Sequence, residues 1–276
     1  MNFAKLEGLA NDFVVTGDTL ADTGLLNTLR ERSLHLCDRR RGIGGDGILC
    51  AIPSASADFG MRIFNADGSE AEMCGNGIRC FAVYLRKTGR WDKPRLTVET
   101  LRGIIRIWFE GQGIRVDMGP PILDASRIPV AKAAGEAIGE RLVVGDREFI
   151  VTAVSMGNPH AVVYADELTD ELVLDFGKKL ESHPFFPKKA NIEFVKVLSD
   201  REIRMRVYER GCGETMACGT GACASVVSGV LNRRHGTAVT AHLPGGDLFI
   251  EWDGGRQSPV YMTGPARWVY SGEMTV

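Results

Sequence analysis

Two cysteine motifs in this chain repeat at a constant distance, and the repeat constrains the fold more than any other feature. The segment Met61–Phe64 leads to Cys74–Gly77, and Met205–Tyr208 leads to Cys218–Gly221, 144 residues later and without a gap. Internal repeats of this length indicate a duplicated domain rather than a solenoid. A duplicated fold places equivalent residues face to face across a pseudo-twofold axis. We therefore expect the two thiols to face one another.

Three further anchors recur at nearly the same offset. They are Asn11 and Asn158 (147 apart), Trp108 and Trp252 (144 apart), and Gly119 and Gly264 (145 apart). Four anchors in order favour duplication over chance similarity. The repeat predicts one domain that contains Cys74 and comprises residues 1–117 plus 262–276. A second domain, residues 118–261, contains Cys218.

Both halves are typical of a mixed α/β (α+β) fold. Residues 13–16, 48–52 and 161–164 are apolar and rich in β-formers, which predicts strands. Apolar side chains at 78, 81, 82 and 85 have helical spacing, and this run ends with Arg86-Lys87 and Gly89. Its second copy, residues 222–232, is apolar or small on nearly every face, as in a buried helix. It also ends with a basic pair and a glycine, Arg233-Arg234 and Gly236, so Gly236 is predicted to close the helix. Each domain is thus predicted to wrap a mixed sheet around one central helix.

Composition excludes several classes of protein. The chain has 276 residues, 44% of them apolar and 25% charged, and its formal net charge is −2. That net charge gives no sign of polyanion binding, so nucleic acid is not expected as a main partner. No apolar run approaches the ~18 residues of a membrane span, and the N-terminus lacks the apolar core of a signal peptide. Seven cysteines, an odd number, fit reduced thiols in a cytoplasmic protein.

A cysteine at a helix start is placed for acid–base chemistry. A helix N-terminus lowers the pKa of a thiol, and glycines let backbone N–H groups approach an anion closely. Two such helix starts could hold one carboxylate while one thiolate removes an α-proton and the opposite thiol returns another. This is the chemistry of a racemase or epimerase. The other cysteines are predicted to be small buried core residues: Cys37, Cys50, Cys80, Cys212 and Cys223.

Other motifs carry less weight. Gly42–Gly47 matches G-x-G-x-x-G, but a helical segment (25–37) precedes it and a strand follows, the reverse of a dinucleotide site. The chain has no C-x-x-C pair, so we expect no metal site. Nothing marks a pyridoxal-phosphate lysine, and no cofactor is predicted.

A set of amides surrounds the two cysteine motifs. Asn11, Asn76, Asn158 and Asn191 each lie beside turn-forming residues, and individually each is most simply a turn residue. Together with Arg210 they predict a pocket for a small zwitterion, because arginine binds a carboxylate bidentately and amides bind both carboxylate and ammonium groups.

These motifs together resemble the diaminopimelate epimerase family along the whole chain. The resemblance is carried by residues 8–13, 64–70, 74–77, 156–160, 209–215 and 217–221. It implies two similar α/β domains with the site between them, no pyridoxal phosphate, and no metal. It also implies interconversion of LL- and meso-diaminopimelate, a step toward lysine and peptidoglycan cross-links.

Carried over by position, the resemblance implies these roles. Cys74 and Cys218 are the paired acid and base, and the backbone of Gly75-Asn76 and Gly219-Thr220 holds the reacting carboxylate. His160 and Glu209 tune the thiols, and Tyr270 lies at a homodimer contact. The implied substrate-binding residues are Asn11, Asn65, Asn158, Asn191, Glu209 and Arg210.

One position departs from the family pattern, and three alternatives stay open. Some members carry glutamine where this chain has Gly47, so any contact from that side chain is absent. The nearest alternative is another two-thiol racemase, of the proline or hydroxyproline type, which needs no site for a second carboxylate. A relative that lost its catalytic thiols and a thiol redox protein are the others. The two retained cysteines disfavour a relative without catalytic thiols, and the lack of C-x-x-C disfavours a thiol redox protein.

Overall fold

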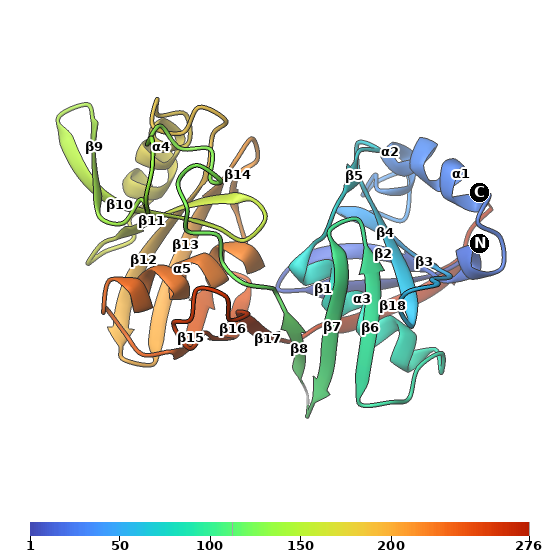
Figure 1. The fold of residues 1–276 in the computed structure, drawn as a ribbon. Coiled ribbons are helices and arrows are strands. Elements are labelled where there is room, and N and C mark those ends of the chain that lie inside the picture. The colour runs from blue at the N-terminus through green and yellow to red at the C-terminus, as the bar shows by residue number, and fades with distance from the viewer. Residues whose placement is uncertain (112, 276) are drawn as a thin grey trace. The chain divides into compact units, whose positions relative to one another are not determined.

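A computed structural model of the chain describes residues 1–111 and 113–275. Its residues divide into two compact units (Figure 1). The first unit comprises Met1–Asp117 with Thr263–Val276, and the second comprises Met118–Met262. The sequence-based division differs from these units at Met262, which was predicted to lie with the first domain.

The first unit is built on a mixed sheet. Its neighbouring strands run in the order β18-β1-β2-β3-β4-β6-β7-β8, and β5 is a short partner of β4. The pairs β2–β3 and β4–β6 are parallel and the others are antiparallel. The strands are β1 (Asn2–Gly8), β2 (Asn11–Thr16), β3 (Gly47–Ile52), β4 (Phe59–Asn65), β5 (Glu70–Ala71), β6 (Arg95–Thr100), β7 (Gly103–Glu110), β8 (Gly113–Asp117) and β18 (Arg267–Glu273).

The second unit repeats this arrangement. Its order is β9-β10-β11-β12-β13-β15-β16, with β14 paired to β13, and here β11–β12 and β13–β15 are the parallel pairs. Its strands are β9 (Glu140–Val144), β10 (Arg147–Ser155), β11 (Pro159–Tyr164), β12 (Asn191–Ser199), β13 (Glu202–Glu209), β14 (Gly213–Thr215), β15 (Ala238–Leu243) and β16 (Gly246–Glu251). Strand β17 (Tyr261–Gly264) contains the point where the chain passes back to the first unit.

Each unit contains one long buried helix, as predicted. Helix α3 (Gly75–Lys87) contacts β1, β2, β3, β8 and β18, and helix α5 (Gly219–Leu231) contacts β10, β11, β12 and β16. The strands therefore surround the helix, and the predicted fold class is confirmed. Because strands pack against most sides of each helix, the N-terminus is the part of the helix that can offer polar groups to a ligand.

The ends of the two helices differ. Helix α3 ends before Thr88, and Gly89 takes a left-handed conformation with φ of 70°, as its glycine predicted. Helix α5 ends before Asn232, and the left-handed residue is Arg233 (φ 55°), not a glycine. The prediction that Gly236 closes this helix was wrong. Instead, the Arg234 N–H bonds the carbonyl oxygen of Gly229 and satisfies the helix end.

The short elements agree in part with the sequence. The three predicted strands are confirmed as parts of β2, β3 and β11. The helical segment predicted over 25–37 is two pieces, α1 (Leu25–Glu31) and α2 (Ser33–Leu36), joined at Arg32. Short helical turns also occur at η1 (Asp18–Leu20), η2 (Glu171–Phe176) and α4 (Gly177–Glu181). Within the described residues, every helix is too short or too polar to cross a membrane.

Candidate active site

Cys74 caps the N-terminus of α3. Its backbone is extended (φ −138°, ψ 121°), and its Sγ accepts a hydrogen bond from the Gly77 N–H at 3.3 Å. The thiol also lies 3.7 Å from Asn11 Oδ1, which accepts a second bond from Asn76 Nδ2 at 3.4 Å. The structure thus brings together three predicted site residues, Cys74, Asn11 and Asn76.

A charged network behind Asn11 holds this amide in place. Asn11 Nδ2 donates to Asp46 Oδ2 at 2.6 Å, and Arg39 bridges Asp46 and Asp12 at 2.8 and 2.7 Å. Lys5 lies 2.6 Å from Asp12. Burial alone would raise the pKa of Asp12, but hydrogen bonds from Arg39 and Lys5 outweigh burial and hold that pKa well below its usual range.

A buried arginine underlies the start of α3. Arg79 is fully buried, and its guanidinium donates to the carbonyl oxygens of Gly75 (2.9 Å) and Pro265 (3.1 Å) and to Asn76 Oδ1 (2.9 Å). Because Oδ1 is bound to Arg79, Asn76 keeps its Nδ2 directed to Asn11. Arg79 therefore fixes both the first turn of α3 and the orientation of a site amide.

Cys218 caps α5 in the same way, but its surroundings are charged. Its backbone is also extended (φ −124°, ψ 107°), its Sγ accepts from the Gly221 N–H at 3.3 Å, and Thr220 Oγ1 lies 3.5 Å away. Burial, followed by the negative charges of Glu209 and Glu193, raises the pKa of this thiol well above its ordinary value. The expectation that the helix start lowers the pKa is therefore wrong for Cys218, since the helix effect is outweighed.

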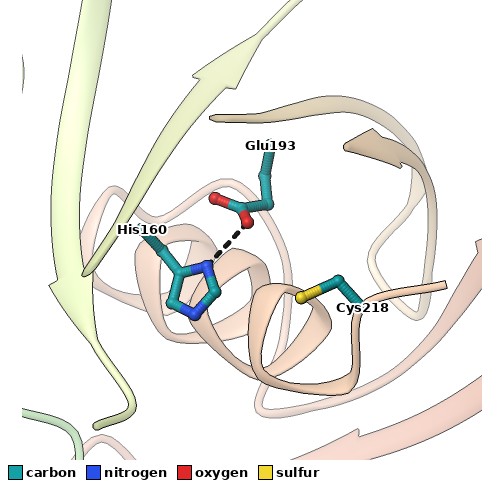
Figure 2. A group of neighbouring side chains, drawn as sticks. All are labelled: His160, Glu193 and Cys218. Atoms are coloured by element: carbon teal, nitrogen blue, oxygen red, sulfur yellow. Dashed lines mark hydrogen bonds and ion pairs between the residues drawn. The ribbon is translucent and has the colours of Figure 1, made fainter. Parts of the chain in front are cut away.

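Three side chains converge at this second helix start (Figure 2). His160 on β11 and Glu193 on β12 are fully buried, with Nδ1 and Oε1 2.7 Å apart, and the Cys218 sulfur lies beside the pair. The other ring nitrogen, Nε2, lies 3.0 Å from Asn158 Oδ1. His160, which was predicted to tune the thiols, thus lies beside the Cys218 thiol, while Glu193 was not predicted.

Glu209 is a second carboxyl group beside Cys218. Its Oε1 accepts a hydrogen bond from Thr215 Oγ1 at 2.5 Å. Burial is the largest influence on this group and raises its pKa above the ordinary carboxyl value. The structure therefore groups Glu209, His160 and Cys218, as the predicted roles require.

Asn191 links this cluster to Arg210. Its Oδ1 accepts from the Arg210 backbone N–H at 2.9 Å, and its Nδ2 donates to the Pro159 carbonyl oxygen at 3.3 Å. The Arg210 side chain is exposed, so its guanidinium is accessible to a ligand. Asn65, in the first unit, ends β4 and donates from Nδ2 to Ser69 Oγ at 3.0 Å. Its substrate role stays a prediction.

The remaining predicted residues lie where the sequence placed them. Gly75-Asn76 and Gly219-Thr220 form the first turns of α3 and α5, whose N–H groups have no partner within a helix. A side chain at Gly47 would approach the Phe64 carbonyl oxygen to 2.7 Å, so the chain has no room there for more than glycine. Because Cys74 and Cys218 belong to different units, their facing arrangement stays a prediction.

A metal ion fits the second helix start poorly. His160, Glu193 and Cys218 offer donor atoms within 4.8 Å of one another. However, Nδ1 and Oε1 are 2.7 Å apart. Two ligands at about 2.1 Å from a tetrahedral zinc ion would lie about 3.4 Å apart. The distance is that of a hydrogen bond, and the pair is suited to sharing a proton.

Sequence reasoning missed the residues that hold these side chains in place: Glu193, Arg79, Asp12, Asp46, Arg39 and Lys5. Glu193 had a signal, since it is a lone acid within the apolar strand Asn191–Val195. Arg79 had a similar one within the apolar face of α3. Among the other cysteines, Cys37, Cys50, Cys80 and Cys223 are buried as predicted, whereas Cys212 is exposed in a turn, so its assignment to the core was wrong.

The fold recurs in solved structures of small-molecule isomerases and related proteins. A hydroxyproline epimerase from Agrobacterium vitis aligns with a TM-score of 0.70 over 99% of this chain and 90% of its own, at 16% identity. A PhzF-family phenazine biosynthesis protein from Bacillus anthracis aligns with a TM-score of 0.69 over 100% and 99%, also at 16% identity. At this identity the likeness defines the fold class, and no more.

Sequence comparison is more specific. Residues 3–123 and 152–269 match the diaminopimelate epimerase family. Diaminopimelate epimerase of Desulforudis audaxviator is 51% identical over 99% of both chains. That of Pelotomaculum thermopropionicum is 49% identical over 99% of this chain and 98% of its own. The chain belongs to the diaminopimelate epimerase family.

Proposed function

We propose that this protein interconverts LL- and meso-diaminopimelate by a mechanism with two cysteines. The observation that carries the proposal is the matched pair of helix starts, each capped by a cysteine whose sulfur accepts a backbone N–H at 3.3 Å. The family membership supplies the substrate. The reaction makes the protein an isomerase in the biosynthesis of lysine and of peptidoglycan precursors.

The proton transfers balance without a cofactor. A thiolate takes the α-proton as the Cα–H bond breaks, and the electron pair passes into the carboxylate, held by the N–H groups of Gly75-Asn76 and Gly219-Thr220. The opposite thiol then gives its proton to the other face of Cα. Each turnover exchanges the protonation states of Cys74 and Cys218, which therefore titrate as a coupled pair. Positioned acid–base groups of this kind contribute roughly 10²- to 10⁴-fold each.

The far end of the substrate distinguishes this function from proline-type chemistry. Diaminopimelate carries a second carboxylate and a second ammonium group, which suit the exposed Arg210 guanidinium and the amides of Asn158, Asn191, Asn65 and Asn11. Proline and hydroxyproline lack those groups. Racemisation of proline is the alternative reaction, and proline therefore serves as the control substrate.

Isotope exchange tests the proposal. The reduced enzyme is incubated with LL-diaminopimelate in deuterated water, and the product is separated by chirality and analysed by mass spectrometry. We expect meso-diaminopimelate with deuterium at the inverted α-carbon, and no turnover of proline or hydroxyproline. Inversion without deuterium uptake, or faster turnover of proline, would contradict the proposal.

We further propose that the protein acts as a cytoplasmic homodimer without pyridoxal phosphate. Tyr270 supports the dimer contact, since it is 44% exposed on β18 while its ring packs edge-on against Phe3, 6.1 Å between centroids. Its hydroxyl donates to the Ile43 carbonyl oxygen at 3.1 Å. Sedimentation of wild type and Tyr270→Glu would test this. A buried charge should raise the dimer dissociation constant, and an unchanged dissociation constant would remove Tyr270 from the interface.

A further inference from the structure

The buried carboxylate of Glu193 is the feature of the site that the proposed chemistry leaves unexplained. Its side chain is fully buried, and Oε1 is bound to His160. The second oxygen, Oε2, is also buried and has no hydrogen-bond partner among the described residues. An unpaired buried carboxylate oxygen is costly, so its presence calls for a reason other than stability.

Glu193 lies directly against the start of α5. A Cβ placed on Gly221 would be 2.7 Å from Glu193 Oε1 and 3.2 Å from Cys218 Sγ. The carboxylate and the sulfur thus flank the same glycine, whose N–H donates to the sulfur. Figure 2 shows the carboxylate, the imidazole and the thiol grouped at this helix start. Any change in the charge of Glu193 therefore changes the electrostatic potential at the Cys218 sulfur.

The first unit shows what the fold itself requires at this position. Leu49 is the repeat equivalent of Glu193, 144 residues earlier. Phe13 pairs with Gly47 as His160 pairs with Asn191, so Phe13 is the equivalent of His160. Around Gly77, Leu49 Cδ2 and Phe13 Cζ lie 3.3 and 3.5 Å from a built Cβ. Apolar side chains fill the same space there, so packing does not demand an acid in the second unit.

We propose that Glu193 is a positioning residue of the Cys218 site, which orients the His160 ring and keeps the proton on Cys218 between turnovers, so that two matched thiols are unequal before substrate binds. The inference rests on the proposed function and deepens it. Through His160, Glu193 also fixes Asn158, because Nε2 lies 3.0 Å from Asn158 Oδ1 and leaves the Asn158 NH₂ group to meet the substrate.

The charges around the sulfur support this assignment. The titratable groups that face Cys218 are His160 on β11, Glu193 on β12 and Glu209 on β13. After burial, the two carboxylates are the main reasons that the pKa of the Cys218 thiol is raised. His160 is the one basic side chain of the three, and its contact with Glu193 holds the ring beside the sulfur.

The test compares Glu193→Gln, which keeps the shape, with Glu193→Leu, which copies the first unit. Alkylation of reduced, substrate-free enzyme by iodoacetamide is followed by peptide mapping as a function of pH. We expect the Cys218 profile to move to lower pH in both variants, while the Cys74 profile, measured in the same sample, stays in place. We also expect kcat/KM for LL-diaminopimelate to fall about tenfold or more, with a changed pH profile.

Glu202→Gln is the matched control. It removes an exposed glutamate beside another histidine, with His242 Nε2 3.6 Å from Glu202 Oε1, on the neighbouring strand β13. It should leave alkylation and turnover unchanged. The proposal would be wrong if folded Glu193→Gln protein kept both the wild-type alkylation profile of Cys218 and the wild-type pH dependence of kcat/KM. Glu193 would then have a structural role alone. Because alkylation needs no substrate, a shifted profile in an enzyme that ignores diaminopimelate would overturn the proposed function instead.

Discussion

The two helix starts share their backbone and differ in almost everything that surrounds it. Both cysteines are extended caps, and both sulfurs accept an N–H at 3.3 Å. Around Cys74 lie Asn11, Phe13 and Leu49, whereas around Cys218 lie His160, Glu193 and Glu209. Duplication preserved the geometry of the cysteine caps. Divergence then placed a histidine and a glutamate beside Cys218, at positions where the first unit has the apolar Phe13 and Leu49.

The buried charges of the two starts also have opposite signs. Arg79 is the fully buried ion beneath Cys74 and binds the carbonyl oxygen of the next residue, while Glu193 is the fully buried ion beside Cys218. A reaction that must run from both faces of one carbon needs two thiols, but a free enzyme needs one proton shared between them. The two thiols therefore lie close to buried ions of opposite charge.

The largest expected effect is the loss of inversion when either thiol is removed. Cys74→Ala and Cys218→Ala should each lower epimerisation by at least about 100-fold, because one face of the α-carbon loses its acid or base. The remaining thiolate can still exchange the α-proton on its own face. We therefore expect the two variants to exchange deuterium with opposite stereoisomers, measured separately on LL- and meso-diaminopimelate. Deuterium exchange with the same stereoisomer by both variants would contradict the assignment of one thiol to each face of the α-carbon.

Removing the buried cation of the first unit should have the next largest effect. Arg79→Met removes the donor of three hydrogen bonds, two of them buried, and should cost about 3 kcal/mol in the free energy of unfolding. Arg86→Met is the control in the same helix. Its side chain is exposed and lies over the Phe109 ring at 3.8 Å, so it should cost less than about 1 kcal/mol. Equal losses in urea unfolding would show that Arg79 has no special structural role.

Glycine substitutions compare the two starts directly. A methyl group at Gly221 would meet Glu193 Oε1 at 2.7 Å, whereas at Gly77 its nearest neighbours are Cys74 Cβ and the end of the flexible Leu49 side chain, at 3.3 Å. We expect Gly221→Ala to lower kcat/KM by roughly tenfold to 100-fold, since it displaces the carboxylate and the thiol together. Gly77→Ala should lower it less. A larger loss at Gly77 would reverse the comparison.

Much of the fold could be predicted from the sequence, because sequence repeats and hydrophobic periodicity can be recognised without knowing the tertiary structure. Each central helix, its capping cysteine and the strands around it follow from spacing and from residue type. The end of α5 could not be predicted, since Arg233 adopts a left-handed conformation that usually requires glycine. Exposure of Cys212 depends on the turn between β13 and β14, which residue type does not determine.

The ionisation of the site could not be predicted for a different reason. The sequence suggested that a helix start lowers a thiol pKa. At Cys218, burial and two carboxylates that come from distant strands outweigh the helix. Such a sum depends on side chains 9 to 25 residues away in the chain. Only the fold brings them within reach of the sulfur.

The smallest expected effect is a contrast in the pH dependence of stability. The pKa of Glu209 is raised, mainly by burial, so the folded protein loses stability as pH rises above the usual carboxyl range. Glu209→Gln should therefore gain stability relative to wild type between about pH 4 and neutrality. For Asp12, hydrogen bonds from Arg39 and Lys5 overcome burial and lower the pKa, so its contribution is present above about pH 4 and is lost as pH falls. Asp12→Asn should accordingly be less stable than wild type near neutrality, with the difference shrinking in acid. Urea midpoints of the two variants, measured across this range, should thus differ from wild type in opposite directions. A shift in the same direction would show that burial, rather than the local partners of each carboxylate, determines the pH dependence of stability at both sites.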